Sequence, residues 1–173
     1  MAPTGSDLVK YDVGTTFAGF HYDLNFLTIH GKSRYPGLYI WLRNMTKIAV
    51  KIPNGCLLLQ GGSMFEHITG GYVHAGFHEV VYTEGTKAAL DKAREDPNRK
   101  LWRVSSTLFS HLRYNVDISP MAEMKGFYSE EDASKYKKMT AHEKLMEELR
   151  AINLAPAEAD KKVDVTEQLK SMM

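Results

Sequence analysis

The chain has 173 residues, a length that suits one domain with a sizeable core. Hydrophobic residues make up 43% and charged residues 25%, which is ordinary for a globular protein. The net charge of +1 provides no field that would attract nucleic acid or an anionic membrane. The single cysteine, Cys56, excludes an internal disulfide, and its apolar neighbours predict burial. No segment resembles a signal core or a membrane span, so we expect a cytoplasmic protein without nucleic-acid or membrane partners.

Residues 7–120 are predicted to form mostly β-strands. Short apolar or alternating runs are separated by turns that contain glycine, and they cover residues 26–30, 37–42, 47–52, 57–60, 72–73, 80–83 and 102–109. The run at 57–60 is apolar enough to predict a buried strand. Many short strands with frequent glycine turns favour a sandwich or a barrel.

Two regions are predicted to be helical. The first is residues 86–94, which lie between strands and have Thr86 as a candidate cap. The second lies within residues 121–173, where two pairs have capping-box spacing: Ser129 with Asp132 and Thr140 with Glu143. An apolar stripe follows at Leu145, Met146, Leu149 and Ile152. Residues 157–173 are predicted to be a loose tail or a last short helix. We therefore divide the chain into a β core at 7–120 and a helical extension at 121–173.

His21 and Asp23 are the first candidate metal ligands. In a strand, residues i and i+2 point to the same side, so both side chains can reach one ion while Tyr22 faces away. On spacing alone, a His-x-Asp pair is more often a polar strand end at the surface. Two imidazoles and one carboxylate, however, can bind one face of a divalent iron and leave the opposite positions open. A third ligand must therefore come from elsewhere in the chain.

The β region offers several further histidines: His30, His67, His74, His78 and His111. His30 lies seven residues after Asp23, and this odd offset predicts that it faces the opposite side of a continuous strand. His78 opens an apolar β run, where a ligand at the mouth of a barrel should lie. His74 has an even offset from His78 and could share its face, whereas Glu79 should point outward as a surface charge. We favour His78 as the third ligand.

Arg103 and Ser105 form a second constellation. They also lie two residues apart in a predicted strand, so a guanidinium and a hydroxyl can together hold a carboxylate. This pair carries little information alone, and it gains weight from its position after His78 near the end of the β region.

Taken in order, these motifs resemble a known superfamily. The chain is similar to the iron(II)- and 2-oxoglutarate-dependent dioxygenases, in the branch that contains isopenicillin N synthase. The similar segments are residues 21–28 (HYDLNFLT), 36–40 (PGLYI), 52–62 (IPNGCLLLQGG), 67–72 (HITGGY), 78–80 (HEV) and 103–105 (RVS).

The resemblance implies a double-stranded β-helix, or jelly roll, with an inserted helix and C-terminal helices. It further implies that His21, Asp23 and His78 hold iron(II), and that Arg103 and Ser105 hold the far carboxylate of 2-oxoglutarate with help from Tyr11. The expected reaction couples 2-oxoglutarate decarboxylation to the oxidation of a small organic substrate by dioxygen.

The chain departs from the family pattern at four places. Glu79 replaces an arginine, Gly70 replaces an asparagine, and the stretch 84–100 is longer than usual. The region that family members carry before the first jelly-roll strand is missing, so the chain resembles a catalytic core. Two alternatives stay open: an oxidase like isopenicillin N synthase that uses no 2-oxoglutarate, and an inactive jelly-roll binding module.

Overall fold

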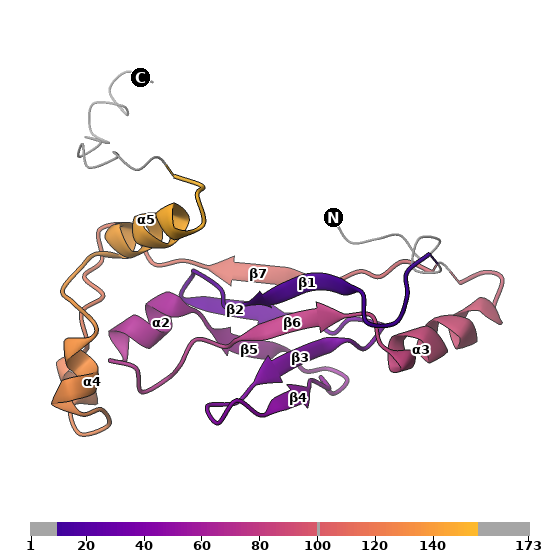
Figure 1. Cartoon of the computed structure of the whole chain (residues 1–173), viewed down its shortest axis with the longest axis horizontal. Helices are drawn as coiled ribbons and strands as arrows, with labels where there is room; N and C mark the ends of the chain where they lie inside the picture. Colours follow the sequence, from indigo (N-terminus) through magenta and orange to yellow (C-terminus); the bar gives the residue numbers. More distant parts are fainter. Residues whose placement is uncertain (1–9, 100, 156–173) are drawn as a thin grey trace, which may run out of the picture.

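The computed structural model describes residues 10–99 and 101–155, which fold mainly into two antiparallel β-sheets lying in layers (Figure 1). The first sheet has four strands in the order β1 (Thr16–His21), β6 (His78–Val81), β3 (Leu38–Trp41) and β4 (Lys47–Ala49). The second sheet has three strands in the order β5 (Leu58–Gly61), β2 (Leu27–His30) and β7 (Thr107–Ser110).

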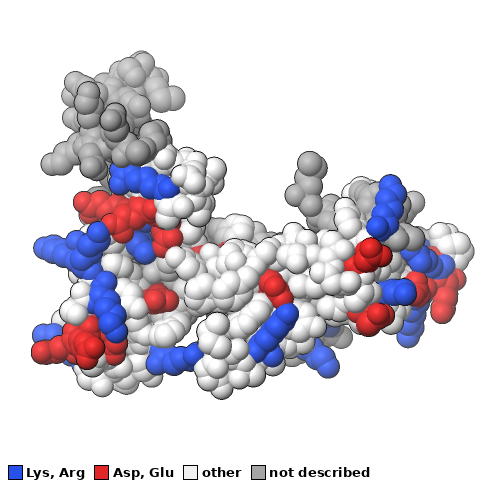
Figure 2. Space-filling view, in the orientation of Figure 1, with Lys and Arg blue, Asp and Glu red and all other residues white. Residues whose placement is uncertain are grey.

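The helices lie at the two ends of the layered sheets (Figure 1). At one end lies α3 (Glu84–Arg94); at the other lie α2 (Ser63–Ile68), α4 (Glu130–Ser134) and α5 (Ala141–Ala151), and a short 3₁₀ turn covers Ala122–Met124. Figure 2 shows that the charged side chains gather over these helical ends, whereas the surface over the strands between them is largely uncharged.

The helices predicted from sequence are confirmed, with one change of start. Ser129 caps α4, and Thr140 and Glu143 form the expected capping box of α5. The inserted helix begins earlier than predicted, because Thr83 is its cap and Thr86 stands at its third position, where it completes a capping box. Of the predicted stripe on α5, Leu145 packs into a core cluster but Ile152 is exposed.

Two apolar clusters hold the ends of the molecule. Leu90 and Ala93 of α3 pack with Tyr35 at one end. At the other end, Met64 of α2 packs with residues that follow the last strand and begin α5: Ile118, Met139 and Ala141.

A bulge in β1 sets the direction of its side chains. Ala18 pairs with Val80 and His21 pairs with His78, so three residues of β1 match two residues of β6. An extra residue of this kind re-aims the side chains that follow it. As a result Ala18 and His21 line the same cavity although their offset is odd.

Several predictions about the strands are wrong. Residues 72–73 form bends rather than a strand, and the last strand starts only at Thr107, so residues 101–106 are irregular. Helix α2 was not predicted. Cys56, Leu57 and Leu59 are exposed. Leu59 pairs with Ile29, which pairs with Leu108 on its other side, and strand alternation turns this row away from the cavity that His30 lines.

No helix among the described residues is both long and apolar enough to cross a bilayer. The last short helix considered within 157–173 lies outside the described residues.

Candidate metal centre

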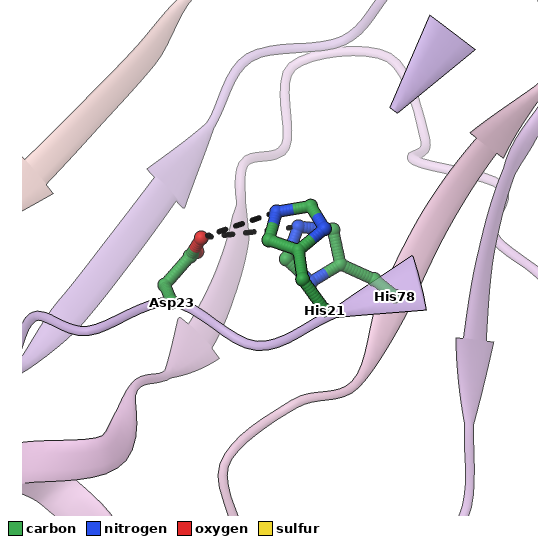
Figure 3. A group of neighbouring side chains, drawn as sticks. All are labelled: His21, Asp23 and His78. Carbon is green, nitrogen blue, oxygen red and sulfur yellow. Dashed lines mark ion pairs between the residues drawn. The ribbon is translucent and has the colours of Figure 1, made fainter. Parts of the chain in front are cut away.

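The structure brings His21, Asp23 and His78 together at one end of β1 and β6 (Figure 3). His21 is the last residue of β1, and it lies opposite His78, the first residue of β6. Asp23 follows β1 rather than belonging to it, yet its carboxylate turns toward both imidazoles (Figure 3). The metal site predicted from sequence is thus a compact group of three side chains, of which Asp23 and His78 are buried.

The spacing of the three side chains suits one metal ion. Asp23 Oδ1 lies 3.7 Å from His21 Nε2 and 4.0 Å from His78 Nε2, and one ligand atom from each residue lies within 4.8 Å of the others. Bonds of roughly 2.0–2.2 Å to a shared ion put its ligand atoms roughly 3–4 Å apart. A small contraction would therefore complete the coordination.

Both metal-site imidazoles turn Nδ1 toward a backbone carbonyl. His21 Nδ1 lies 2.6 Å from the Gly19 carbonyl oxygen, and His78 Nδ1 lies 2.9 Å from the Gly76 carbonyl oxygen. A carbonyl can only accept, so these contacts favour a proton on Nδ1 and leave the Nε2 lone pair for an ion. His78 Nδ1 also lies 2.8 Å from Gln60 Nε2. Burial lowers the pKa of His78, which favours the neutral imidazole that binds metal.

A repeated tripeptide in the sequence accompanies this arrangement. The tripeptide Gly-Phe-His occurs twice, at residues 19–21 and 76–78. In each copy the glycine carbonyl accepts from the histidine. The two phenylalanine rings, Phe20 and Phe77, stack 4.8 Å apart. Strand alternation places each phenylalanine on the face opposite its histidine.

A buried polar cluster orients Asp23. Its Oδ2 accepts a hydrogen bond of 2.6 Å from Thr28 Oγ1 and one of 3.3 Å from Gln60 Nε2. Thr28 in turn accepts from Asn25 Nδ2 at 3.0 Å. Because Oδ2 is engaged in this way, Oδ1 is the oxygen that faces the imidazoles. Thr28 and Gln60 were not predicted as site residues, although each is a lone polar residue at an apolar run.

A cavity of about 470 Å³ opens beside the three side chains, between the two sheets. Arg103 and Ser105 line this cavity together with His21, Asp23 and His78, although neither lies on a strand as predicted. Burial lowers the pKa of Arg103, but an arginine remains a cation throughout the physiological range.

The charge of the lining favours an anion. Four cationic residues line the cavity against the single carboxylate of Asp23: Lys32, Arg34, Lys51 and Arg103. Clefts that carry one sign of charge concentrate ligands of the opposite sign.

Tyr11 is not brought to this cavity. Its side chain is 39% exposed and packs edge-on against Phe17, with ring centroids 5.5 Å apart. The cavity lining among the described residues does not include it. Its suggested contact with a carboxylate therefore stays a prediction from the resemblance alone.

The remaining candidates lie elsewhere. Glu79 contacts Lys47 on the outer face of the first sheet, as predicted. His67 is buried in α2 with its Nε2 2.8 Å from the Lys137 carbonyl oxygen, and His74 and His111 are exposed. His30 is different. Although its odd offset predicts the far side, it belongs to the second sheet and faces the cavity from there.

Comparisons with known proteins agree on the fold. No protein-family model and no curated protein matches the chain. Solved structures do match. One is a full-length protein from Neurospora crassa in complex with alpha-KG and 5-formyluracil, which is 19% identical to this chain. The matched region covers 84% of this chain and 43% of the Neurospora protein, with a TM-score of 0.62. A putative oxygenase from Shewanella oneidensis is 25% identical, with coverages of 84% and 44% and a TM-score of 0.58. A putative 2OG-Fe(II) oxygenase family protein from Caulobacter crescentus is 24% identical, with coverages of 78% and 40% and a TM-score of 0.60.

The fold is therefore that of the 2-oxoglutarate and iron(II)-dependent oxygenases. The chain spans less than half the length of each of these three proteins.

Proposed function

We propose that the chain is the catalytic core of a non-haem iron(II) oxygenase that uses 2-oxoglutarate and dioxygen to oxidise a small organic molecule. The observation that supports this most directly is the meeting of two imidazole Nε2 atoms and one carboxylate oxygen in a polar cavity between two sheets. Two nitrogen ligands and one oxygen ligand form the donor set of non-haem iron(II) oxygenases.

In this proposal His21, Asp23 and His78 hold the iron. The donor set fits, because each histidine turns Nδ1 to a backbone carbonyl and Nε2 toward Asp23, which presents one unengaged oxygen. Iron bound here would supply the activation of dioxygen. The protein would contribute the orientation of the ligands and the exclusion of water by the sheet walls.

The far carboxylate of 2-oxoglutarate would bind Arg103 and Ser105. Both residues line the cavity that holds the metal ligands, and the Nε of Arg103 is buried without a hydrogen-bond partner among the described residues. A buried donor with no partner costs free energy until an acceptor arrives. Tyr11 would need to turn from Phe17 to take part.

We further propose that the two sheets are the walls of a double-stranded β-helix of the isopenicillin N synthase-like branch. The core would span residues 7–120 and the helical extension residues 121–173; residues 7–9, 100 and 156–173 of these ranges lie outside the described part of the chain. The ordered motifs and the antiparallel pairing support the jelly-roll core.

An anaerobic titration tests the proposal in two steps. Iron(II) is added first, and we expect one site with low-micromolar or tighter affinity that is lost in His78→Ala. 2-Oxoglutarate is then added, and succinate release in air is measured. Absence of iron binding would refute the metal centre. Iron binding without 2-oxoglutarate binding would favour an oxidase that does not use this co-substrate, and binding of both without succinate release would favour an inactive binding module.

A further inference from the structure

His30 lies in the cavity but is not one of the three ligands. It is the last residue of β2, in the sheet opposite His21 and His78, and its ring centroid is 5.9 Å from that of His78. The rings are nearly perpendicular, at 75°. Among the described residues, only His21, Asp23 and His78 form a group with ligand atoms close enough to share an ion. His30 therefore lies beside the metal centre without belonging to it.

The Nε2 atom of His30 is buried and has no hydrogen-bond partner among the described residues. Buried polar groups are almost always paired, because an unpaired one costs free energy. A leucine would fit this end of an apolar strand without that cost. Because His30 lines the cavity, a ligand bound there could supply the missing partner.

A second buried nitrogen lines the same cavity without a partner, the Nε of Arg103. Arg103 lies in the irregular segment before β7, whereas His30 lies next to the ring of His78. Both residues line one cavity, and His30 is the one whose ring lies beside a metal ligand. A ligand with an acceptor at each end would satisfy both.

We propose that His30 donates a hydrogen bond from Nε2 to the metal-side carboxylate of a bound 2-oxo acid. His30 would thus be a binding residue for the co-substrate, distinct from the anchor at Arg103. This inference rests on the proposed function, because it takes the oxo acid as the ligand of the cavity. It assigns to His30 the end of the molecule beside the metal and to Arg103 the far carboxylate.

The test uses protein loaded with Mn(II) without oxygen, so that no turnover occurs, and calorimetry with two ligands. 2-Oxoglutarate has both ends, and oxalate has only the metal-side end. We expect His30→Leu to weaken the binding of both ligands by about 5- to 30-fold. This is the effect of losing one hydrogen bond to a charged group, worth about 1–2 kcal/mol. His30→Gln, which keeps a donor, should stay within about threefold of the wild type. Arg103→Gln should weaken 2-oxoglutarate and leave oxalate unchanged.

Two controls separate this role from a structural one. His111→Leu changes an exposed histidine outside the cavity lining and should alter neither ligand. The unliganded His30→Leu protein should melt at a higher temperature than the wild type, because an unpaired buried nitrogen is replaced by an apolar group. A lower melting temperature would show that the imidazole supports the fold, and it would overturn the inference.

The remaining outcomes distinguish the two levels of the proposal. If Mn-loaded wild type binds oxalate and 2-oxoglutarate and His30→Leu binds them equally well, the role of His30 is wrong and the proposed function stands. If His30→Leu loses Mn(II) itself, His30 belongs to the metal centre and the inference fails. If the Mn-loaded wild type does not bind 2-oxoglutarate, the proposed function fails and the inference fails with it.

Discussion

Removal of the Thr28 hydroxyl is the sharpest test of how the carboxylate ligand is oriented. Thr28 is fully buried, with 0% exposure, and its Oγ1 donates to Asp23 Oδ2 at 2.6 Å. Thr28→Val nearly preserves the shape of the side chain and removes the hydroxyl, which donates to Asp23 and accepts from Asn25. Asp23 then keeps the weaker contact of 3.3 Å with Gln60 and loses the bond that fixes which oxygen faces the imidazoles.

The expected loss follows from the bonds removed. Loss of an outer hydrogen bond to a metal ligand typically weakens metal binding by about 10- to 100-fold, or about 1.4–2.7 kcal/mol. Asn25 Nδ2 also loses its contact with the hydroxyl at 3.0 Å, so the free energy of unfolding should fall by roughly 1–2 kcal/mol. The metal affinity is measured by anaerobic calorimetry with Fe(II) or Mn(II), and stability by urea denaturation of the metal-free protein.

Thr86→Val is the matched control. Thr86 is also 0% exposed, and its hydroxyl bonds the Pro36 carbonyl oxygen and the Thr83 amide at the start of α3, away from the ligands. This variant should lose stability but keep its metal affinity. If Thr28→Val binds metal within about twofold of the wild type, the idea that Thr28 orients Asp23 is refuted.

Three further predictions follow from the site. His78→Ala should abolish measurable metal binding in calorimetry, whereas His74→Ala, at an exposed position nearby, should leave it unchanged. Burial lowers the pKa of His78 and His67 in the folded protein, so the unfolded chain binds more protons below about pH 6.5. The free energy of unfolding of the metal-free protein should therefore fall as the pH drops from about 6.5 toward the folded pKa values. Urea denaturation at pH 7.5 and at pH 5.5 measures this difference. A pH-independent stability would contradict it. Tyr22→Phe should lower the free energy of unfolding by roughly 0.5–1.5 kcal/mol, because the phenol donates to Glu148 of α5 at 3.2 Å. An unchanged melting temperature would show that this hydrogen bond does not stabilise the fold.

Local signals in the sequence predicted α4 and α5 with their caps and α3 with its cap three residues late, but they did not predict α2. The capping box of α5 lies within four consecutive residues, so its pattern can be recognised without knowledge of the fold. The β character of the core was also predictable, because most strands follow short apolar runs between turns. Arg103 and Ser105 do line the cavity that was expected for them, although their segment is irregular.

The errors arise where a prediction needed the pairing of distant strands. The prediction that His30 faces the far side assumes one continuous strand from Asp23 onward. In the structure β1 ends at His21 and β2 belongs to the other sheet, so parity counted along the chain has no meaning between them. The same cause explains Leu59, whose outward direction follows from its row with Ile29 and Leu108 rather than from its hydrophobicity.

The Gly-Phe-His repeat shows how local and distant information combine at this site. Within each copy the histidine Nδ1 contacts the carbonyl two residues earlier, so local sequence favours the tautomer that leaves Nε2 free. The meeting of the two histidines is instead fixed by the register of β1 against β6, which the bulge in β1 adjusts. A change that shifts this register by one residue would leave both tautomers intact and still turn one histidine to the other face. The orientation of each imidazole therefore depends on its neighbours in the sequence. The metal centre as a whole depends on the pairing of His21 with His78, which lie 57 residues apart in the chain.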